Sequence, residues 1–208
     1  TGAASLWEQG STQGLRGVAS RVTAEEREAR FGQRPMVLLL MGLTGAGKST
    51  VAYALERRLF DMGHAATVLD GQNMRLGASK DLGFDPDSRS ENLRRGVEIA
   101  KLMTDAGLIT IGAFVAPSEE IRQRARETLG DSLITVHLNA PLEVCRERDT
   151  TGLYASADQD GLDSVPGVTL PFDPPVNPDL VLPTHELSVD ESVERLIQLL
   201  RERGAVGT

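Results

Sequence analysis

One segment has the residue types and spacing of a loop that wraps around phosphate groups. Residues 42–49 match the pattern G-x-x-x-x-G-K-[ST], with an apolar run before them and an amphipathic stretch after them. Glycines let the backbone approach phosphate oxygens closely, and a following helix adds the positive end of its dipole. We expect Lys48 to reach the β- and γ-phosphates of a nucleotide, and Ser49 to hold Mg²⁺ through its hydroxyl.

This loop predicts a bound nucleoside triphosphate and leaves the acceptor of any transferred phosphate open. The motif N-K-x-D, which recognises guanine in GTPases, is absent from the sequence, so ATP is the expected nucleotide. A glycine-rich turn that binds nothing is the alternative, and the flanking pattern disfavours it. The loop residues expected to bind ATP are Gly42, Thr44, Gly45, Ala46, Gly47, Lys48, Ser49 and Thr50.

A carboxylate ends the second predicted strand. Asp70 begins the run D-G-Q-N-M-R, which follows that strand directly. A carboxylate at this place can orient Mg²⁺ or accept the proton of an acceptor hydroxyl, so Asp70 and Lys48 are the expected catalytic residues. The alternative is an aspartate that only caps a turn at the strand end.

Four arginines in the next segment are candidates for binding an anion. They are Arg75, Arg89, Arg94 and Arg95. The planar guanidinium suits bidentate capture of phosphate or sulfate. Arg75 and Arg89 lie in loop-like sequence, which favours a binding role, whereas for Arg94 and Arg95 a solvated helix face is an equally good interpretation.

The elements that must position these residues alternate between strands and helices. Short apolar runs predict strands at 36–41, 65–69, 108–114, 133–138 and 180–182. Apolar residues at helical spacing and helix-start signals predict helices at 23–30, 50–62, 92–106, 118–129, 190–203 and from 141 to about 148. This alternation predicts an α/β protein, a P-loop NTPase-type three-layer fold with a mostly parallel central sheet. The segment 149–179 is rich in Gly, Pro and Asp, which predicts a functional loop, a lid or a disordered segment. We expect residues 149–173 to be mobile without ligand.

Composition narrows the classes of protein that this chain can belong to. The 208 residues suit one domain, for which we expect a flexible tail or linker remnant at 1–21 and a kinase domain at 22–208. A net charge of −8 argues against a general nucleic-acid or membrane-surface binder. The chain opens without a signal-peptide pattern, and its apolar runs are too short to span a bilayer, so a cytoplasmic location is expected. Cys145, the one cysteine, is expected to be buried in a helix.

With these residues assembled, the chain resembles the adenylyl-sulfate (APS) kinase family from about Val22 to Arg203. The resemblance rests on an ordered set of motifs rather than on the phosphate loop alone. These are G-L-T-G-A-G-K-S-T from Gly42, L-D-G-Q-N-M-R from Leu69, K-D-L-G-F from Lys80, R-S-E-N-L-R-R from Arg89, A-F-V-A-P from Ala113, P-L-E-V-C from Pro141, R-D at Arg148, G-L-Y from Gly152 and N-P-D-L-V-L from Asn177.

The resemblance implies transfer of phosphate from ATP to the 3′-hydroxyl of APS with Mg²⁺, giving 3′-phospho-APS (PAPS). It also implies a homodimer, often fused to an ATP sulfurylase. Asp70 would belong to a catalytic acidic pair, and segment 149–175 would be the closing lid. Phe84 would stack on the adenine of APS. The residues implied in substrate binding are Arg75, Phe84, Arg89, Asn92 and Phe114, and Arg148 is implied in ATP binding.

Several positions depart from the family pattern, and they fall together around the acceptor. The second aspartate of the usual D-G-D-N is Gln72. The usual lid sequence is K-G-L-Y-K-K, and its three lysines are replaced here by Thr151, Ala155 and Ser156. Further departures are Leu76, Ala78-Ser79, Ala116-Pro117-Ser118, and Val165 near the place of a lid phenylalanine that would clamp the adenine.

These departures leave three hypotheses. The first is an APS kinase whose turnover is slowed by the changes. The second is a kinase that phosphorylates another hydroxylated nucleotide. The third is a regulatory nucleotide-binding domain with little turnover inside a larger sulfate-activating protein. Intact Lys48, Ser49 and Asp70 favour an enzyme, whereas Gln72 and the lysine-free lid favour the third hypothesis.

Overall fold

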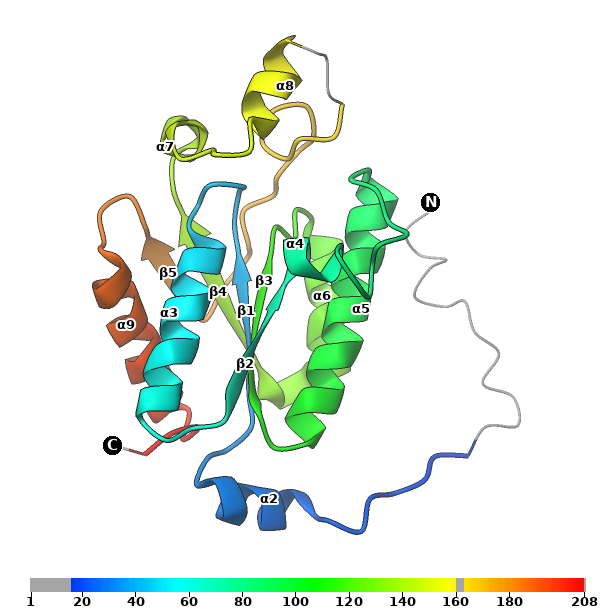
Figure 1. Cartoon of the computed structure of the whole chain (residues 1–208), viewed down its shortest axis with the longest axis vertical. Coiled ribbons are helices and arrows are strands. Elements are labelled where there is room, and N and C mark those ends of the chain that lie inside the picture. The colour runs from blue at the N-terminus through cyan, green and yellow to red at the C-terminus, as the bar shows by residue number, and fades with distance from the viewer. Residues whose placement is uncertain (1–15, 160–162, 208) are drawn as a thin grey trace.

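A five-stranded parallel sheet forms the middle layer of the protein (Figure 1). The computed structural model describes residues 16–159 and 163–207. The strands are β1 (Val37–Met41), β2 (Ala66–Asp70), β3 (Ile109–Phe114), β4 (Leu133–Asn139) and β5 (Leu180–Pro183), in the order β2-β3-β1-β4-β5. All neighbouring pairs are parallel, and every residue of β1 is buried, as its continuous apolar run predicts.

Helices cover both faces of the sheet, and the sheet lies between two apolar cores. Helices α3 (Lys48–Asp61) and α9 (Val189–Glu202) pack on one face, and α5 (Pro86–Asp105) and α6 (Glu119–Leu129) pack on the other (Figure 1). Alternate residues of β1 supply the two cores, with Leu38 and Leu40 in the first and Leu39 in the second. The predicted three-layer α/β fold is therefore confirmed.

Four shorter helices are also present within the described ranges. Helix α2 (Ala24–Phe31) begins at a capping box between Thr23 and Glu26, as its sequence predicts. Helix α4 (Gly71–Met74) follows β2 directly, and α7 (Leu142–Glu147) and α8 (Leu153–Gln159) lie beyond the carboxyl ends of the strands (Figure 1). A 3₁₀ turn, η1 (Gly130–Ser132), leads into β4.

The structure corrects three expectations about elements. Helix α5 begins at Pro86, capped by Asp85, rather than at residue 92. Its first turns are polar and show no apolar stripe, so the sequence pattern missed them, and Arg89 consequently lies on a helix. Helix α4, which the sequence pattern did not predict, lies between β2 and Arg75, and Arg75 itself lies in the turn that follows, as expected. The segment 149–179 contains helix α8, whose seven residues are too few for a clear helical period.

Other sequence expectations have mixed outcomes. Cys145 is buried on α7, as expected. Residues 16–21 of the predicted tail are exposed and form no regular element, and residues 1–15 lie outside the described residues. Within the described ranges, no helix combines the length and apolar character that crossing a bilayer requires. The predicted mobility of the lid segment stays a prediction.

Candidate active site

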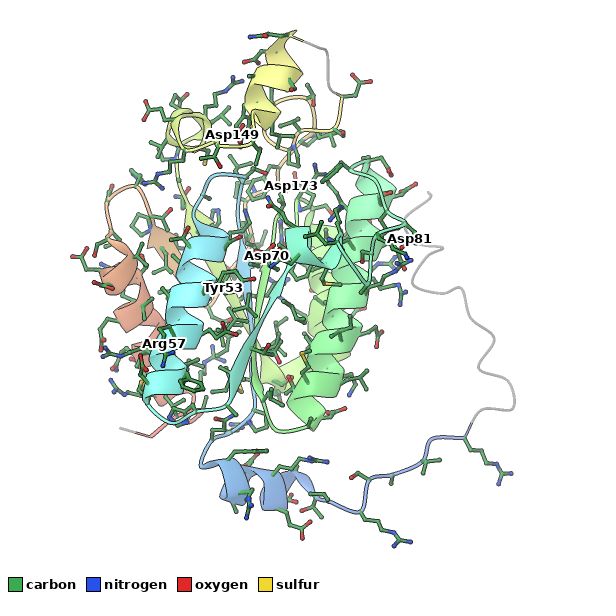
Figure 2. The ribbon with its side chains drawn as sticks, viewed as in Figure 1. Tyr53, Arg57, Asp70, Asp81, Asp149 and Asp173 are labelled. Atoms are coloured by element: carbon green, nitrogen blue, oxygen red, sulfur yellow. The ribbon has the colours of Figure 1, made fainter. Side chains whose placement is uncertain are left out.

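A cavity of about 1030 Å³ lies at the carboxyl end of the sheet, and the glycine-rich loop lines it. The loop follows β1, where the chain crosses to strands on either side, which is the usual place for a ligand in an open parallel sheet. Asp70 ends β2, which β3 separates from β1 in the sheet, and Asp149 and Asp173 belong to segments beyond this edge of the sheet (Figure 2).

The backbone of the loop presents unpaired N–H groups to this cavity. Within the described residues, the N–H groups of Gly45 and Gly47 have no acceptor, and no side chain caps the start of α3. Gly45 has φ +82°, and a Cβ there would lie 2.4 Å from the carbonyl oxygen of Cys145, so only glycine fits. Two expected phosphate-binding residues, Gly42 and Ala46, are buried beside the cavity and do not line it.

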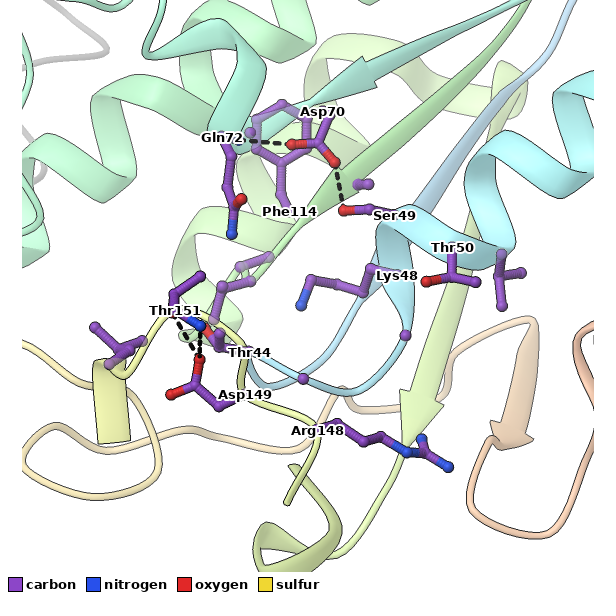
Figure 3. A pocket seen from close by; sticks show the side chains of 18 of the residues that line it. Thr44, Lys48, Ser49, Thr50, Asp70, Gln72, Phe114, Arg148, Asp149 and Thr151 are labelled. Carbon is purple, nitrogen blue, oxygen red and sulfur yellow. Dashed lines mark hydrogen bonds between the residues drawn. The ribbon is translucent and has the colours of Figure 1, made fainter. Parts of the chain in front are cut away.

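Lys48 is the cation at the start of α3, and its side chain points into the cavity (Figure 3). Its Nζ donates to the carbonyl oxygen of Leu43 at 2.7 Å, and within the described residues it forms no ion pair. Burial lowers the pKa of the Lys48 ammonium to about 8, which the nearby Asp70 carboxylate only partly offsets. The ammonium is therefore placed for an anionic ligand that the protein itself does not supply.

This lowered pKa predicts that ADP affinity depends on pH. Bound phosphates favour the charged ammonium and raise the pKa of Lys48 in the complex, so binding takes up a proton above pH 8. We expect the affinity for ADP, whose phosphates are fully ionised there, to fall roughly tenfold between about pH 7 and pH 9. Titration calorimetry of the native protein over this range measures the slope. An affinity for ADP that stays constant would contradict the assignment, and Lys48→Ala should abolish the slope.

Asp70 caps a turn, as one of its two interpretations expects, whereas its catalytic role stays a prediction. The side chain is 5% exposed, and its Oδ1 accepts from the backbone N–H groups of Gln72 at 2.8 Å and Asn73 at 3.3 Å, which caps α4. Its Oδ2 accepts a hydrogen bond from the hydroxyl of Ser49 (Figure 3). The second oxygen and the Ser49 hydroxyl thus lie together beside the phosphate loop.

These two oxygens fit a magnesium site. Mg²⁺ usually takes one or two protein oxygens and completes its shell with phosphate oxygens and water. Among the described residues, no group of three or more His, Cys, Asp or Glu side chains is placed to hold a metal by itself. A metal at Ser49 and Asp70 would consequently depend on the nucleotide phosphates.

One wing of the cavity contains two cations stacked on an aromatic ring. The guanidinium carbons of Arg75 and Arg89 lie 4.8 and 5.6 Å from the ring centroid of Phe84, which is 55% exposed. Arg75 donates to the backbone carbonyl oxygen of Gly83, and Arg89 donates to other backbone carbonyls. Within the described part of the chain, neither arginine forms an ion pair. Burial, and then repulsion from Arg75, lower the pKa of the Arg89 guanidinium to about 10.

Asn92 and Phe114 form the floor of the same wing. The amide nitrogen of Asn92 donates to the carbonyl oxygen of Gly71 at 3.1 Å, whereas its buried Oδ1 has no partner within the described ranges. Phe114 packs against Gly71 and Gly96, where a Cβ on Gly96 would approach the ring to 2.5 Å. An unpaired buried acceptor is costly, so Asn92 is placed to accept a hydrogen bond from a ligand.

The two remaining arginines belong to the surface of α5. Arg94 pairs with Glu91 at 2.7 Å, and Arg95 pairs with both Glu91 and Asp81. Neither lines the cavity. Their interpretation as part of a helix face is the one that fits the structure.

The opposite wing was largely missed by sequence reasoning. Arg148 was expected there, and its guanidinium donates to the carbonyl oxygen of Thr184 at 3.1 Å. The other lining residues of this wing follow β5 and open α9: Thr184, Leu187, Ser188, Val189 and Ser192. The signal that could have found them is the capping box of Ser188 and Glu191, which places a helix start at the carboxyl edge of the sheet.

The positions that depart from the family pattern are not all at the cavity. Gln72, Leu76, Thr151 and Ser156 line it, whereas Ala155 does not. The Gln72 side chain points away from the carboxylate of Asp70 and toward Thr151 (Figure 3). Val165, which falls near the place of the lid phenylalanine, is fully buried in an apolar core, and the backbone carbonyl oxygen of its neighbour Ser164 accepts from Arg89 at 2.8 Å.

The class of P-loop kinases is defined by three features: a three-layer fold with a parallel central sheet, a glycine-rich phosphate loop with its lysine, and an aspartate at the end of another strand of the sheet. This protein has all three. Residues 34–183 match the family described as adenylylsulphate kinase. The chain belongs to this adenylylsulphate kinase family.

Relatives and solved structures agree with this assignment. A bifunctional enzyme CysN/CysC of Rhodopirellula baltica is 47% identical over 204 residues, and the match covers 97% of this chain and 32% of that protein. The chain thus spans about a third of the length of that relative. An adenylyl-sulfate kinase of Bacteroides thetaiotaomicron is 42% identical over 180 residues, covering 86% of this chain and 90% of that one. The solved APS kinase CysC of Mycobacterium tuberculosis, in complex with AMPPNP and APS, is 39% identical, with a TM-score of 0.77 over 81% of this chain and 99% of that one.

Proposed function

We propose that this protein transfers the γ-phosphate of ATP to the 3′-hydroxyl of APS, which yields PAPS and ADP. The observation that carries the proposal is the acceptor wing, where Arg75 and Arg89 flank Phe84 beside Asp70. Two guanidiniums that form no ion pair within the described residues suit the phosphate and sulfate groups of APS, and the exposed ring suits its adenine. The relatives named adenylyl-sulfate kinase support the same acceptor.

The two wings divide the cavity between donor and acceptor. The phosphate loop lies between them, so the base of ATP would occupy the wing of Arg148, Thr184 and Val189. Lys48 and the Gly45 and Gly47 N–H groups would hold its phosphates. Charge spreads over the transferring phosphoryl group, and these donors stabilise it without forming a covalent intermediate.

Asp70 is the group that handles the proton in this proposal. Its carboxylate accepts the proton of the attacking hydroxyl as the oxygen–phosphorus bond forms. Mg²⁺, held by Ser49 and Asp70 together with the phosphates, would supply positive charge to the leaving ADP. Asn92 would accept a hydrogen bond from APS through its unpaired Oδ1.

Assembly and location also belong to the proposal. We propose a homodimer in the cytoplasm, and an association with an ATP sulfurylase as a fused or separate partner. The bifunctional CysN/CysC relative, of which this chain matches about a third, supports a fused form.

The direct test is an assay of ADP release coupled to NADH oxidation. We expect ADP release with APS, and none with an APS analogue that lacks the 3′-hydroxyl. A panel of other adenosine nucleotides tests the kinase for another nucleotide. ADP release with one of these and not with APS would establish that alternative, and nucleotide binding without turnover would establish a regulatory domain.

Gln72→Asp separates a weakened kinase from a reshaped site. A carboxamide cannot take a proton or add negative charge near Mg²⁺, so Asp70 does both alone. We expect the variant to raise kcat with APS about tenfold, which is about 1.4 kcal/mol of barrier. Gln123→Glu is the control for added charge, because Gln123 is exposed on α6, and this variant should leave kcat unchanged. An unchanged kcat in Gln72→Asp would show that Gln72 does not limit the reaction.

A further inference from the structure

Tyr154 joins the lid segment to the phosphate loop. It lies on α8, its side chain is 2% exposed, and its hydroxyl donates to the backbone carbonyl oxygen of Thr44 at 2.8 Å. The two residues are far apart in the sequence, and α8 lies beyond the carboxyl ends of the strands, on the side of the loop (Figure 1). Burial raises the pKa of the Tyr154 phenol, so the hydroxyl keeps its proton and remains a donor.

The tyrosine is itself held in place from two sides. Asp149 accepts from the backbone N–H of Tyr154 at 2.9 Å, which fixes the start of α8. The guanidinium of Arg146, on α7, lies 5.5 Å from the tyrosine ring centroid and also pairs with Asp158 on α8. The hydroxyl is therefore a positioned donor and not a freely rotating surface group.

The hydrogen bond fixes the orientation of one peptide group of the loop. A trans peptide is planar, so its C=O and N–H point in opposite directions. Because Tyr154 holds the Thr44 carbonyl, the N–H of Gly45 must point away from α8. Within the described residues this N–H has no acceptor, and both Thr44 and Gly45 line the cavity.

We propose that Tyr154 is a positioning residue for nucleotide binding: it aims the Gly45 N–H at a phosphate oxygen of ATP or ADP. The proposal rests on the proposed nucleotide-binding function of the loop. Through the same contact, bound phosphates and the lid segment stabilise each other, since each favours the same orientation of the Thr44–Gly45 peptide.

The test compares the two tyrosines of the chain. Tyr154→Phe keeps the ring and removes the hydroxyl, and we expect the affinity for ADP to fall by roughly five- to tenfold, because a charge-assisted hydrogen bond is misaligned. Tyr53→Phe is the matched control. Its hydroxyl accepts from Asn73 at 2.7 Å, and Tyr53 lies on α3 outside the cavity lining (Figure 2), so its loss should leave ADP affinity unchanged.

Calorimetry with ADP and thermal unfolding without ADP distinguish the outcomes. A purely structural role for Tyr154 would lower Tm and leave the ADP affinity of the folded variant unchanged, which would overturn the proposal. Failure of the unaltered protein to bind ADP would instead overturn the proposed function of the loop.

A second measurement decides the matter if Tyr154→Phe does not fold. In the Tyr53→Phe background Tyr154 is the one remaining tyrosine, so incorporated 3-fluorotyrosine gives a single ¹⁹F resonance. We expect saturating ADP to shift this resonance, because ordering the loop changes the hydrogen bond of the hydroxyl. An unshifted resonance in protein shown to bind ADP would overturn the proposal.

Discussion

Lys48→Ala is expected to lower kcat/KM for phosphoryl transfer by about 10³-fold. A donor aimed at transition-state charge contributes a factor of about 10²–10³ to kcat in other enzymes, and this variant loses ground-state binding as well. Lys48 is the cation at the start of α3 within the cavity, and among the described residues its ammonium donates only to the Leu43 carbonyl. Its removal leaves the β- and γ-phosphates without a compensating charge at this place. Initial rates at varied ATP, together with ADP calorimetry, measure the loss.

The control for this variant is another lysine on a helix. Lys101 lies on α5 outside the cavity lining and pairs with Asp105 at 3.4 Å. Lys101→Ala removes the same charge from the protein and should keep both the rate and the ADP affinity of the parent. If Lys48→Ala binds and turns over ATP like the parent, the loop is not the nucleotide site.

Asp70→Asn is expected to lower kcat about 10³-fold, within the range of about 10²–10⁴ that general-base catalysis contributes. Asparagine keeps an oxygen that can accept from the Gln72 and Asn73 N–H groups, so the cap of α4 and the fold should survive. It loses the negative charge and the proton acceptor next to Ser49. We expect metal-free ADP to bind with affinity within about twofold of the parent, because Asp70 is not placed among the phosphate donors.

Asp61→Asn serves as the control for loss of a carboxylate. Asp61 ends α3, is exposed, and pairs with Arg57 on the same helix, outside the cavity lining. Its replacement should leave kcat unchanged. A loss of kcat in Asp70→Asn that is accompanied by an equal loss of metal-free ADP affinity would mean that Asp70 shapes the loop and does not act on the proton.

The fold and the donor half of the site were predictable because local patterns specify them. The apolar run before Gly42 reads as a strand buried on both faces, and β1 is such a strand. The capping box at Thr23 correctly predicts α2. The spacing between Gly42 and Lys48 is itself the geometry of a phosphate loop, so a contiguous stretch carries both the shape and the chemistry.

Elements without a local period were harder to predict. The first turns of α5 and the seven residues of α8 present polar or mixed faces and show no clear apolar stripe. Asp85 caps the first, whereas Asp149 and the buried ring of Tyr154 hold the second. Short helices gain most of their stability from packing, which a sequence window does not contain.

By itself, the sequence determined the succession of strands and helices along the chain, the phosphate loop and the strand-end carboxylate, because each of these features lies within one short segment. Only the tertiary structure decided which distant groups meet. It brought Thr184 and Val189 to the cavity, buried Val165 in an apolar core, and set the hydroxyl of Tyr154 on the loop carbonyl of Thr44. Contacts across a hundred residues depend on how helices and lid pack against the sheet, and no periodicity or motif in the chain encodes that packing locally.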